Sequence, residues 1–230
     1  MKPELRHFGE LASPVVVIDG FSGNAEAVVE VAAALAPYPR HTNYYPGVRR
    51  VITRADEAAD AYVERTCEIA AQFIAGAFDI DRFALLEASF SMVTADPAEL
   101  SPAQRAPHFD TTDPKHLALL HYLRVETGTG TAFYRQRSTG IERVTGSNVD
   151  QFVRTAQAEA ATLADDSGYI QGSNPHFEQI GAVEAVADRM ISYQGSLLHS
   201  GIIPPGMNLS ADPREGRLTA NLFVLGHRGD

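Results

Sequence analysis

The spacing of hydrophobic and polar positions along the chain changes near residue 80. Before that point a short buried strand at 14–21 is followed by the apolar spacing of helices at 25–36 and 55–78. After it, the helical period gives way to short β-rich runs separated by polar and glycine-containing turns. We predict strands in these runs, which lie at 82–93, 115–125, 130–137, 176–186, 189–201 and 216–226.

Two segments interrupt this pattern. Residues 148–164 have the composition of one helix among the strands, and residues 37–50 form a loop punctuated by proline and glycine. The densest basic stretch, "GVRR" at 47–50, is interpreted as a solvated turn. We expect the long connections at about 137–176 and 201–216 to lie as lids over a site, because binding residues are often carried on loops held by a rigid scaffold.

Helices that come first and strands that come later predict an α+β protein, with a β-sandwich or barrel-like core and the helices packed on one side. A chain of 230 residues is most simply one domain, 1–230. Within it, we expect residues 1–80 to be mainly helical support and residues 82–225 to form the core.

Composition narrows the classes of function. With 44% hydrophobic and 21% charged residues, the chain is typical of a globular protein. The net charge of −10 argues against nucleic acid as a partner, because phosphate binding needs a basic stripe. Cys67 is the only cysteine, which excludes a disulfide framework and a cysteine-based zinc site and indicates an inert buried thiol. No secretory signal or membrane span is visible, so we expect a cytoplasmic protein.

The stretch "APHFDTTDP" carries the first candidate chemistry, because His108 and Asp110 are two positions apart. On a strand, this spacing directs both side chains to one face, as two ligands of one metal ion require. Alone the pair is weak evidence, since a loop histidine beside a turn-forming aspartate has the same sequence. His199, at the end of an apolar run downstream, would complete a set of two histidines and one carboxylate, which holds a non-haem Fe(II) and leaves open positions.

The next predicted strand offers a cation for a bound carboxylate. Arg217 has the planar, bidentate donor fork that suits a carboxylate, and Thr219 lies two positions further on, where its hydroxyl would point the same way. Arg214 is a rival for this role, because a long insertion separates His199 from Arg217. A surface arginine after a glycine turn is the alternative interpretation of Arg217.

The ordered set His108-x-Asp110, His199 and Arg217-x-Thr219 resembles the Fe(II)/2-oxoglutarate-dependent dioxygenases, nearest their prolyl-hydroxylase-like branch, over roughly residues 82–225. The resemblance implies a double-stranded β-helix (jelly-roll) core with Fe(II), 2-oxoglutarate and O₂ as cofactors. It also implies hydroxylation of an unactivated C–H bond in a small molecule or a peptidyl side chain, with release of succinate and CO₂. Tyr122 in "ALLHYLR" matches a 2-oxoglutarate-binding tyrosine of that family, and a core tyrosine is equally compatible with its apolar surroundings.

Further contacts are less defined. In "FYRQRSTG", Tyr134 and Arg135 are candidate substrate contacts, but Arg135 and Arg137 share one face of a strand while Tyr134 takes the other. At most one face can line a pocket, and an outward, solvated face is favoured for the arginines. The other histidines of the predicted core lack a partner at ligand spacing and are interpreted as structural: His116, His121 and His176.

Two other functions use the same residues. The first is a jelly-roll module that binds a metal or ligand without oxygen chemistry. The second is a hydrolase or isomerase that holds Zn²⁺ or Mn²⁺ with the same three side chains. The Arg-x-Thr pair favours the oxygenase, because a hydrolase does not need a buried carboxylate anchor. The substrate and the oligomeric state stay open.

Overall fold

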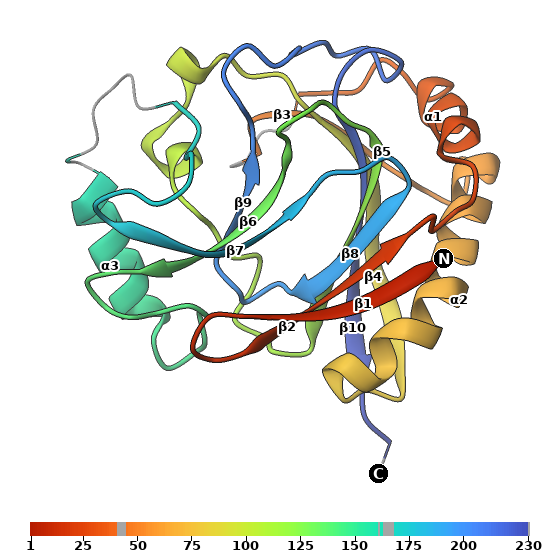
Figure 1. Cartoon of the computed structure of the whole chain (residues 1–230). Helices are drawn as coiled ribbons and strands as arrows, with labels where there is room; N and C mark the ends of the chain where they lie inside the picture. Colours follow the sequence, from red (N-terminus) through yellow and green to blue (C-terminus); the bar gives the residue numbers. More distant parts are fainter. Residues whose placement is uncertain (41–44, 161, 163–167, 230) are drawn as a thin grey trace.

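The computed structural model describes residues 1–40, 45–160, 162 and 168–229. Its strands are Lys2–Phe8 (β1), Ser13–Asp19 (β2), Gly47–Val51 (β3), Arg82–Val93 (β4), His116–Arg124 (β5), Gly130–Gln136 (β6), Phe177–Glu184 (β7), Arg189–Gln194 (β8), His199–Ile202 (β9) and Leu218–His227 (β10). They form a seven-stranded antiparallel sheet in the order β1-β2-β8-β5-β10-β4-β3 and a three-stranded antiparallel sheet in the order β7-β6-β9 (Figure 1).

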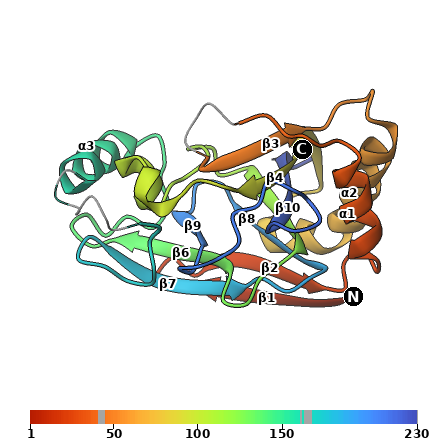
Figure 2. The same ribbon diagram turned by 90° about the horizontal axis from the view of Figure 1, so that it is seen from above.

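Two helices cover the outer face of the seven-stranded sheet, as Figures 1 and 2 show. They are α1 (Ala25–Ala33) and α2 (Glu57–Phe78). Asn24 caps α1 by accepting a hydrogen bond from the Ala27 backbone N–H at 3.2 Å. Asp79 ends α2 in the left-handed conformation, with φ 53°. Alternate residues of the sheet pack against both helices in a buried apolar core that includes Leu119, Phe90, Met92, Leu222, Val63 and Ile74.

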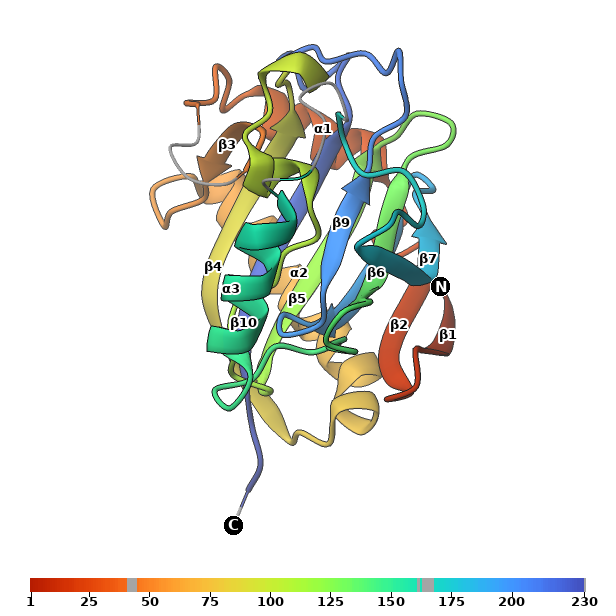
Figure 3. The same ribbon diagram turned by 90° about the vertical axis from the view of Figure 1, so that its left-hand side faces the viewer.

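The third helix, α3 (Val149–Ala160), lies on the opposite side of the molecule, next to the three-stranded sheet (Figures 2 and 3). Phe152 of α3 joins Tyr134 of β6 in a separate apolar cluster. Two short 3₁₀ helices, Pro97–Glu99 and Pro102–Arg105, precede β5. The predicted helix at 148–164 is confirmed as far as Ala160, and residues 161, 163 and 164 of that prediction lie outside the described residues.

The inner faces of the two sheets pack against each other. Both contribute to a buried apolar cluster that includes Val17, Ile191, Tyr193, Phe133 and Val183. The cavity described below adjoins this cluster, and Tyr193 belongs to both. The predicted jelly-roll core with the N-terminal helices on one side is therefore confirmed.

Three predictions of local structure were wrong. Residues 1–80 were predicted as mainly helical support with one strand at 14–21, but β1 and β3 join that strand, β2, in the seven-stranded sheet. The stretch "GVRR" is a strand, not a turn, and Arg49 pairs with Ser91 of β4. The run 189–201 is two strands in different sheets, since the chain turns after Gln194 and enters β9 at His199.

Two further features bear on the sequence predictions. Cys67 on α2 is partly buried against the outer core, and burial raises the pKa of its thiol to about 11, which keeps the thiol protonated and unreactive. Across the described part of the chain, each helix is too short or too polar to cross a membrane.

Candidate metal centre

Three side chains predicted as metal ligands come together at the cavity between the two sheets. One ligand atom from each of His108, Asp110 and His199 lies within 4.8 Å of the other two. It is the single such group of histidine, cysteine or acidic side chains within the described ranges. The spacing of these atoms is compatible with one shared ion.

Backbone hydrogen bonds fix the relative position of the ligands. His108 and His199 exchange two N–H to C=O bonds of 2.9 Å each, as an isolated antiparallel bridge. The two imidazole rings consequently lie with centroids 4.3 Å apart. The Asp110 N–H donates to the carbonyl of Gly195 at 2.7 Å, which places the carboxylate beside the turn that leads into β9.

The imidazole of His199 is oriented for ligation. Its Nδ1 donates to the carbonyl of Leu197 at 2.7 Å, so Nε2 keeps a free lone pair. Nε2 lies 3.8 Å from Oδ1 of Asp110, too far for a hydrogen bond but suitable for two ligands of one ion. The ring of Tyr193 packs edge-on against His199, with centroids 4.8 Å apart.

Both histidines are held in the neutral form that binds metals. Burial lowers the pKa of His108 to about 4, with a smaller contribution from His199 and an opposing one from Asp110. Burial also lowers the pKa of His199 to about 4, against the effect of the bond to Leu197. Burial raises the pKa of Asp110, against the effects of His108, His116 and Arg49. His108 and Asp110 nevertheless stay accessible to solvent through the cavity.

A cavity of about 500 Å³ lies in front of these three residues, and both sheets line it. Arg217 enters it just before β10 and is only 4% exposed. Its guanidinium lies over the ring of Tyr122, at 5.7 Å from the centroid, and donates a long bond of 3.4 Å to the carbonyl of Gly130. Its Nε has no hydrogen-bond partner, and no carboxylate of the described residues pairs with it.

The other residues predicted to bind 2-oxoglutarate divide into two groups. Thr219 lines the cavity beside Arg217. Tyr122 is fully buried beneath Arg217, and its hydroxyl forms a 2.7 Å hydrogen bond with Thr131, so it supports the arginine from outside the cavity lining. Arg214, the rival anchor, is on the surface and pairs with Glu30 of α1 through two bonds of 3.0 and 2.6 Å.

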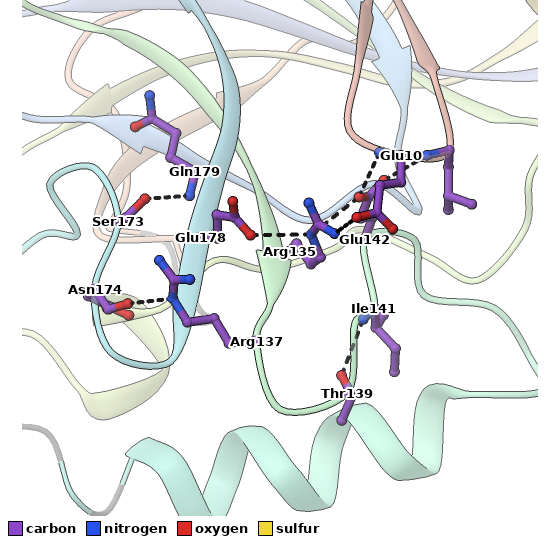
Figure 4. A network of polar contacts seen from close by, with 11 residues as sticks. Glu10, Arg135, Arg137, Thr139, Ile141, Glu142, Ser173, Asn174, Glu178 and Gln179 are labelled. Atoms are coloured by element: carbon purple, nitrogen blue, oxygen red, sulfur yellow. Dashed lines mark hydrogen bonds and ion pairs between the residues drawn. The ribbon is translucent and has the colours of Figure 1, made fainter.

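The two predicted substrate contacts lie away from the cavity, which is a correction. Tyr134 is fully buried in the cluster on the α3 side of β6. Arg135 faces the turn between β1 and β2, where it forms ion pairs with Glu10, Glu142 and Glu178 (Figure 4). Strand alternation correctly separates the two residues, but the face of β6 that carries Arg135 is covered at this point by the β1–β2 turn.

Sequence reasoning missed three residues of the site. The imidazole of His116 lines the cavity, and its Nδ1 is buried without a partner among the described residues. Gly195 permits this arrangement, because a Cβ atom there would lie 2.6 Å from that nitrogen and 3.0 Å from Oδ2 of Asp110. Arg49 also lines the cavity. Only the Gly195 position carried a sequence signal, a glycine inside a run predicted as a strand.

The remaining predictions concern loops and histidines. Both long connections contribute to the cavity, through Tyr169 and Ile203. The lid role itself stays a prediction. His121 and His176 lie outside the lining and have partners of their own, so their structural interpretation agrees with their surroundings.

Comparisons with known proteins agree with this fold. A model described as "Family of unknown function (DUF6445)" matches residues 1–224. No curated protein matches the chain in sequence. Among solved structures, the chain is similar to the non-heme alpha ketoglutarate dependent epimerase SnoN from nogalamycin biosynthesis, with 12% identity, a TM-score of 0.51 and coverage of 94% of this chain and 81% of that one.

Two further structures are similar at the same level. HygX from Streptomyces hygroscopicus, with nickel and 2-oxoglutarate bound, has 14% identity, a TM-score of 0.51 and coverage of 93% and 83%. The collagen prolyl hydroxylase of Paramecium Bursaria Chlorella virus-1 has 11% identity, a TM-score of 0.49 and coverage of 92% and 96%. The predicted resemblance to the Fe(II)/2-oxoglutarate-dependent dioxygenases is therefore confirmed at the level of the fold.

Proposed function

The chain belongs to a family of unknown function, DUF6445, and we propose from its site that it is a non-haem Fe(II)/2-oxoglutarate-dependent oxygenase. The reaction proposed is hydroxylation of an unactivated C–H bond in a small molecule or peptidyl side chain. The observation that carries this proposal is the combination, in one cavity, of the His108, Asp110 and His199 cluster with the guanidinium of Arg217, which pairs with no carboxylate of the described residues.

The three clustered residues fit Fe(II). Two neutral imidazoles and one carboxylate are the donor set of a facial triad, which leaves coordination positions open on the cavity side. The bond from His199 Nδ1 to Leu197 selects the tautomer in which Nε2 is the ligand. When bound, Fe(II) with 2-oxoglutarate and O₂ supplies the oxidation, in which 2-oxoglutarate becomes succinate and CO₂ and one oxygen atom enters the substrate.

Arg217 fits the far carboxylate of 2-oxoglutarate. A buried cation without an anionic partner is unfavourable, so its presence in the cavity favours an anionic ligand. The guanidinium can form two parallel hydrogen bonds with a carboxylate, and the hydroxyl of Thr219 beside it can donate a third. The Tyr122 ring holds the guanidinium from below. A metal-dependent hydrolase would not require this anchor.

The chain's own residues also control what reaches the metal. Part of the wall, formed by Phe109, Ile203 and the ring of Tyr193, is apolar, so a bound substrate would displace water from this side of the ligands. His199 begins β9 and Arg217 directly precedes β10, while backbone hydrogen bonds hold His108 to His199 and Asp110 to Gly195. A bound co-substrate would therefore be held in a defined orientation before the substrate enters.

Succinate formation tests the proposal. Purified metal-free protein is supplied with Fe(II), O₂ and increasing 2-oxoglutarate, and succinate is measured by mass spectrometry. We expect Fe(II)-dependent succinate formation that Arg217→Gln weakens by raising the KM for 2-oxoglutarate about 10- to 100-fold, as expected for loss of a charge-assisted bond pair.

Arg214→Gln is the matched control, because it removes an arginine of the same connection that faces the surface. Its KM for 2-oxoglutarate should stay within about twofold of the unmodified protein. Absence of Fe(II)-dependent succinate in the unmodified protein, or an equal effect of the two variants, would overturn the proposal.

A further inference from the structure

The cavity contains a second arginine, Arg49, which the proposed function does not use. Arg49 comes from β3, at the edge of the seven-stranded sheet, and its side chain is 13% exposed. It lines the same cavity as the metal ligands and Arg217. Glu87 of β4 already pairs with this cation, so the question is which ligand its remaining N–H donors could bind.

Arg49 is held rigidly by its neighbours. Its Nε donates to the hydroxyl of Ser89 at 2.8 Å, and its Nη2 donates to Oε1 of Glu87 at 2.5 Å. The guanidinium also lies over the ring of Phe223, 5.6 Å from the centroid. A ligand that bound here would contact a side chain that is already oriented, so binding would not require the entropic cost of ordering it.

These contacts leave one edge of the guanidinium available. Arginine carries five N–H donors in a planar fork, and Ser89 and Glu87 together use the edge formed by Nε and Nη2. Nη1 takes part in none of the hydrogen bonds between described residues. The edge formed by Nη1 and Nη2 is thus free to form two parallel bonds with a carboxylate.

The backbone of Arg49 is level with Ser91 and Thr219, but its side chain reaches along the sheet, away from Arg217, to Ser89 and Phe223. Along β10 the wall runs from Arg217 through Thr219 and Asn221 to Phe223, the ring beneath Arg49. Phe223 in turn packs against His116, with ring centroids 5.2 Å apart, and His116 is beside the ligand Asp110 at Gly195. A molecule bound at Arg49 would therefore extend over Asn221 toward the metal ligands without occupying the Arg217 end.

We propose, on the basis of the function proposed above, that Arg49 anchors a carboxylate of the substrate, and that the substrate is a small carboxylic acid, such as a free amino acid or hydroxy acid. Ser89 and Glu87 are positioning residues that orient Arg49. A neutral amide of the same acid cannot form the charge-assisted pair, so the site should select the acid over its amide.

The competing explanation is that Arg49 and Glu87 form only a stabilising pair between neighbouring strands. The matched control for this possibility is Arg50, the next residue of β3, which pairs with Asp56 at 2.7 Å and does not line the cavity. If the role of Arg49 is only structural, Arg49→Gln and Arg50→Gln should change the affinity for the acid and amide probes equally.

The experiment uses the full chain with Fe(II) and 2-oxoglutarate. The probes are the proteinogenic amino acids, the corresponding acids without the amino group, and the primary amides of both sets. Each is tested for stimulation of succinate formation, and the best is titrated calorimetrically without O₂, so that binding is measured apart from turnover. We expect at least one acid to stimulate and to bind about 10- to 100-fold more tightly than its amide.

Arg49→Gln should weaken binding of that acid by a similar factor and reduce its preference over the amide, with the KM for 2-oxoglutarate unchanged. Arg50→Gln should leave all three quantities unchanged. The inference is overturned if no acid in the panel stimulates, if amides bind as tightly as acids, or if Arg49→Gln has no larger effect than Arg50→Gln. The panel is scored only after Fe(II)-dependent succinate formation has been established for the unmodified protein. These results are therefore distinct from a failure of the proposed function, in which that succinate formation is absent.

Discussion

The two faces of the seven-stranded sheet carry different kinds of residue, although the same strands supply both. Along β10, alternate side chains face outward into the helix-covered core or inward to the cavity. The outward residues are Leu218, Ala220, Leu222 and Val224, and the inward residues are Thr219, Asn221 and Phe223. The outer face contributes buried apolar packing that stabilises the fold. The inner face is less tightly packed and carries polar groups that can bind a ligand.

Two histidines of β5 show the same division. His121, on the outer side, is fully buried, and both its nitrogens are bonded, Nδ1 to the Tyr62 hydroxyl at 2.9 Å and Nε2 to Asp188 at 3.0 Å. His116, on the cavity side, has a buried Nδ1 without a partner among the described residues. Complete bonding indicates a structural role, whereas an unused donor or acceptor at a cavity indicates a place for a ligand.

The largest effect expected from this comparison is on stability. Leu222→Ala should lower the free energy of unfolding by about 2–5 kcal/mol, because it leaves a void in the outer core. Phe223→Ala, at the next position, should lower it by only about 1 kcal/mol, although more atoms are removed, because that ring already borders an open cavity. Urea denaturation measures both, and an equal loss for the two variants would contradict the division of the sheet.

The next effect concerns the polar network of the outer side. Asp188 accepts hydrogen bonds from His121 and from the hydroxyl and backbone N–H of Ser22, the latter two at 2.5 and 2.8 Å. Burial acts to raise the pKa of this carboxyl, but the hydrogen bonds outweigh it and hold the pKa well below its usual range. Asp188→Asn should lower the free energy of unfolding by about 1–3 kcal/mol at neutral pH.

The pH dependence gives this prediction its direction. Because the pKa of Asp188 is lower in the folded state than in the unfolded state, its contribution is fully present above the unfolded pKa of about 4 and is lost as the pH falls further. The difference in stability between the unmodified protein and Asp188→Asn should therefore be constant from about pH 5 to about pH 7 and decrease below about pH 4. A difference that grew on acidification would contradict it.

The smallest effect is expected at the inner face. Thr219→Val keeps the shape of a cavity-lining side chain but removes its hydroxyl, which contacts only the Ser91 carbonyl and Asn221 at 3.4 and 3.3 Å. Stability should change by less than about 1 kcal/mol, while the KM for 2-oxoglutarate rises about 3- to 10-fold. Thr219→Ser keeps a hydroxyl at this position and should have most of the affinity of the unmodified protein for 2-oxoglutarate. If it does not, the shape of the side chain and not its hydroxyl is responsible for the effect.

The sequence could predict the elements and residues whose signal is local. The strands at 82–93 and 216–226 were predicted because their apolar content and turn boundaries are evident, and the jelly-roll fold followed from the ordered motif. His108, Asp110 and His199 were predicted as one set, and the structure brings them within 4.8 Å. Arg217 was preferred to Arg214 only weakly, and burial now separates the two.

The features that the sequence could not predict depend on contacts between distant segments. β1 and β3 are edge strands, so their sequences, "KPELRHF" and "GVRRV", show little apolar content and resemble loops. For Arg135, alternation predicts which residues share a face but not what covers it, which here is a turn more than 120 positions away, as its ion pair with Glu10 shows. Arg49 was missed for both reasons, since it is on an edge strand and its cavity is formed by other segments.

The central claim is that one cavity binds Fe(II) at His108, Asp110 and His199 and 2-oxoglutarate at Arg217. The most direct test is an anaerobic titration of metal-free protein with Fe(II) and then 2-oxoglutarate, followed by the visible absorption band that a 2-oxoglutarate chelate of Fe(II) produces. The claim predicts a band in the unmodified protein and no band in His199→Ala. In Arg217→Ala, the band should form only at much higher 2-oxoglutarate concentrations. Bound metal without a band in the unmodified protein, or a band that survives in His199→Ala, would contradict it.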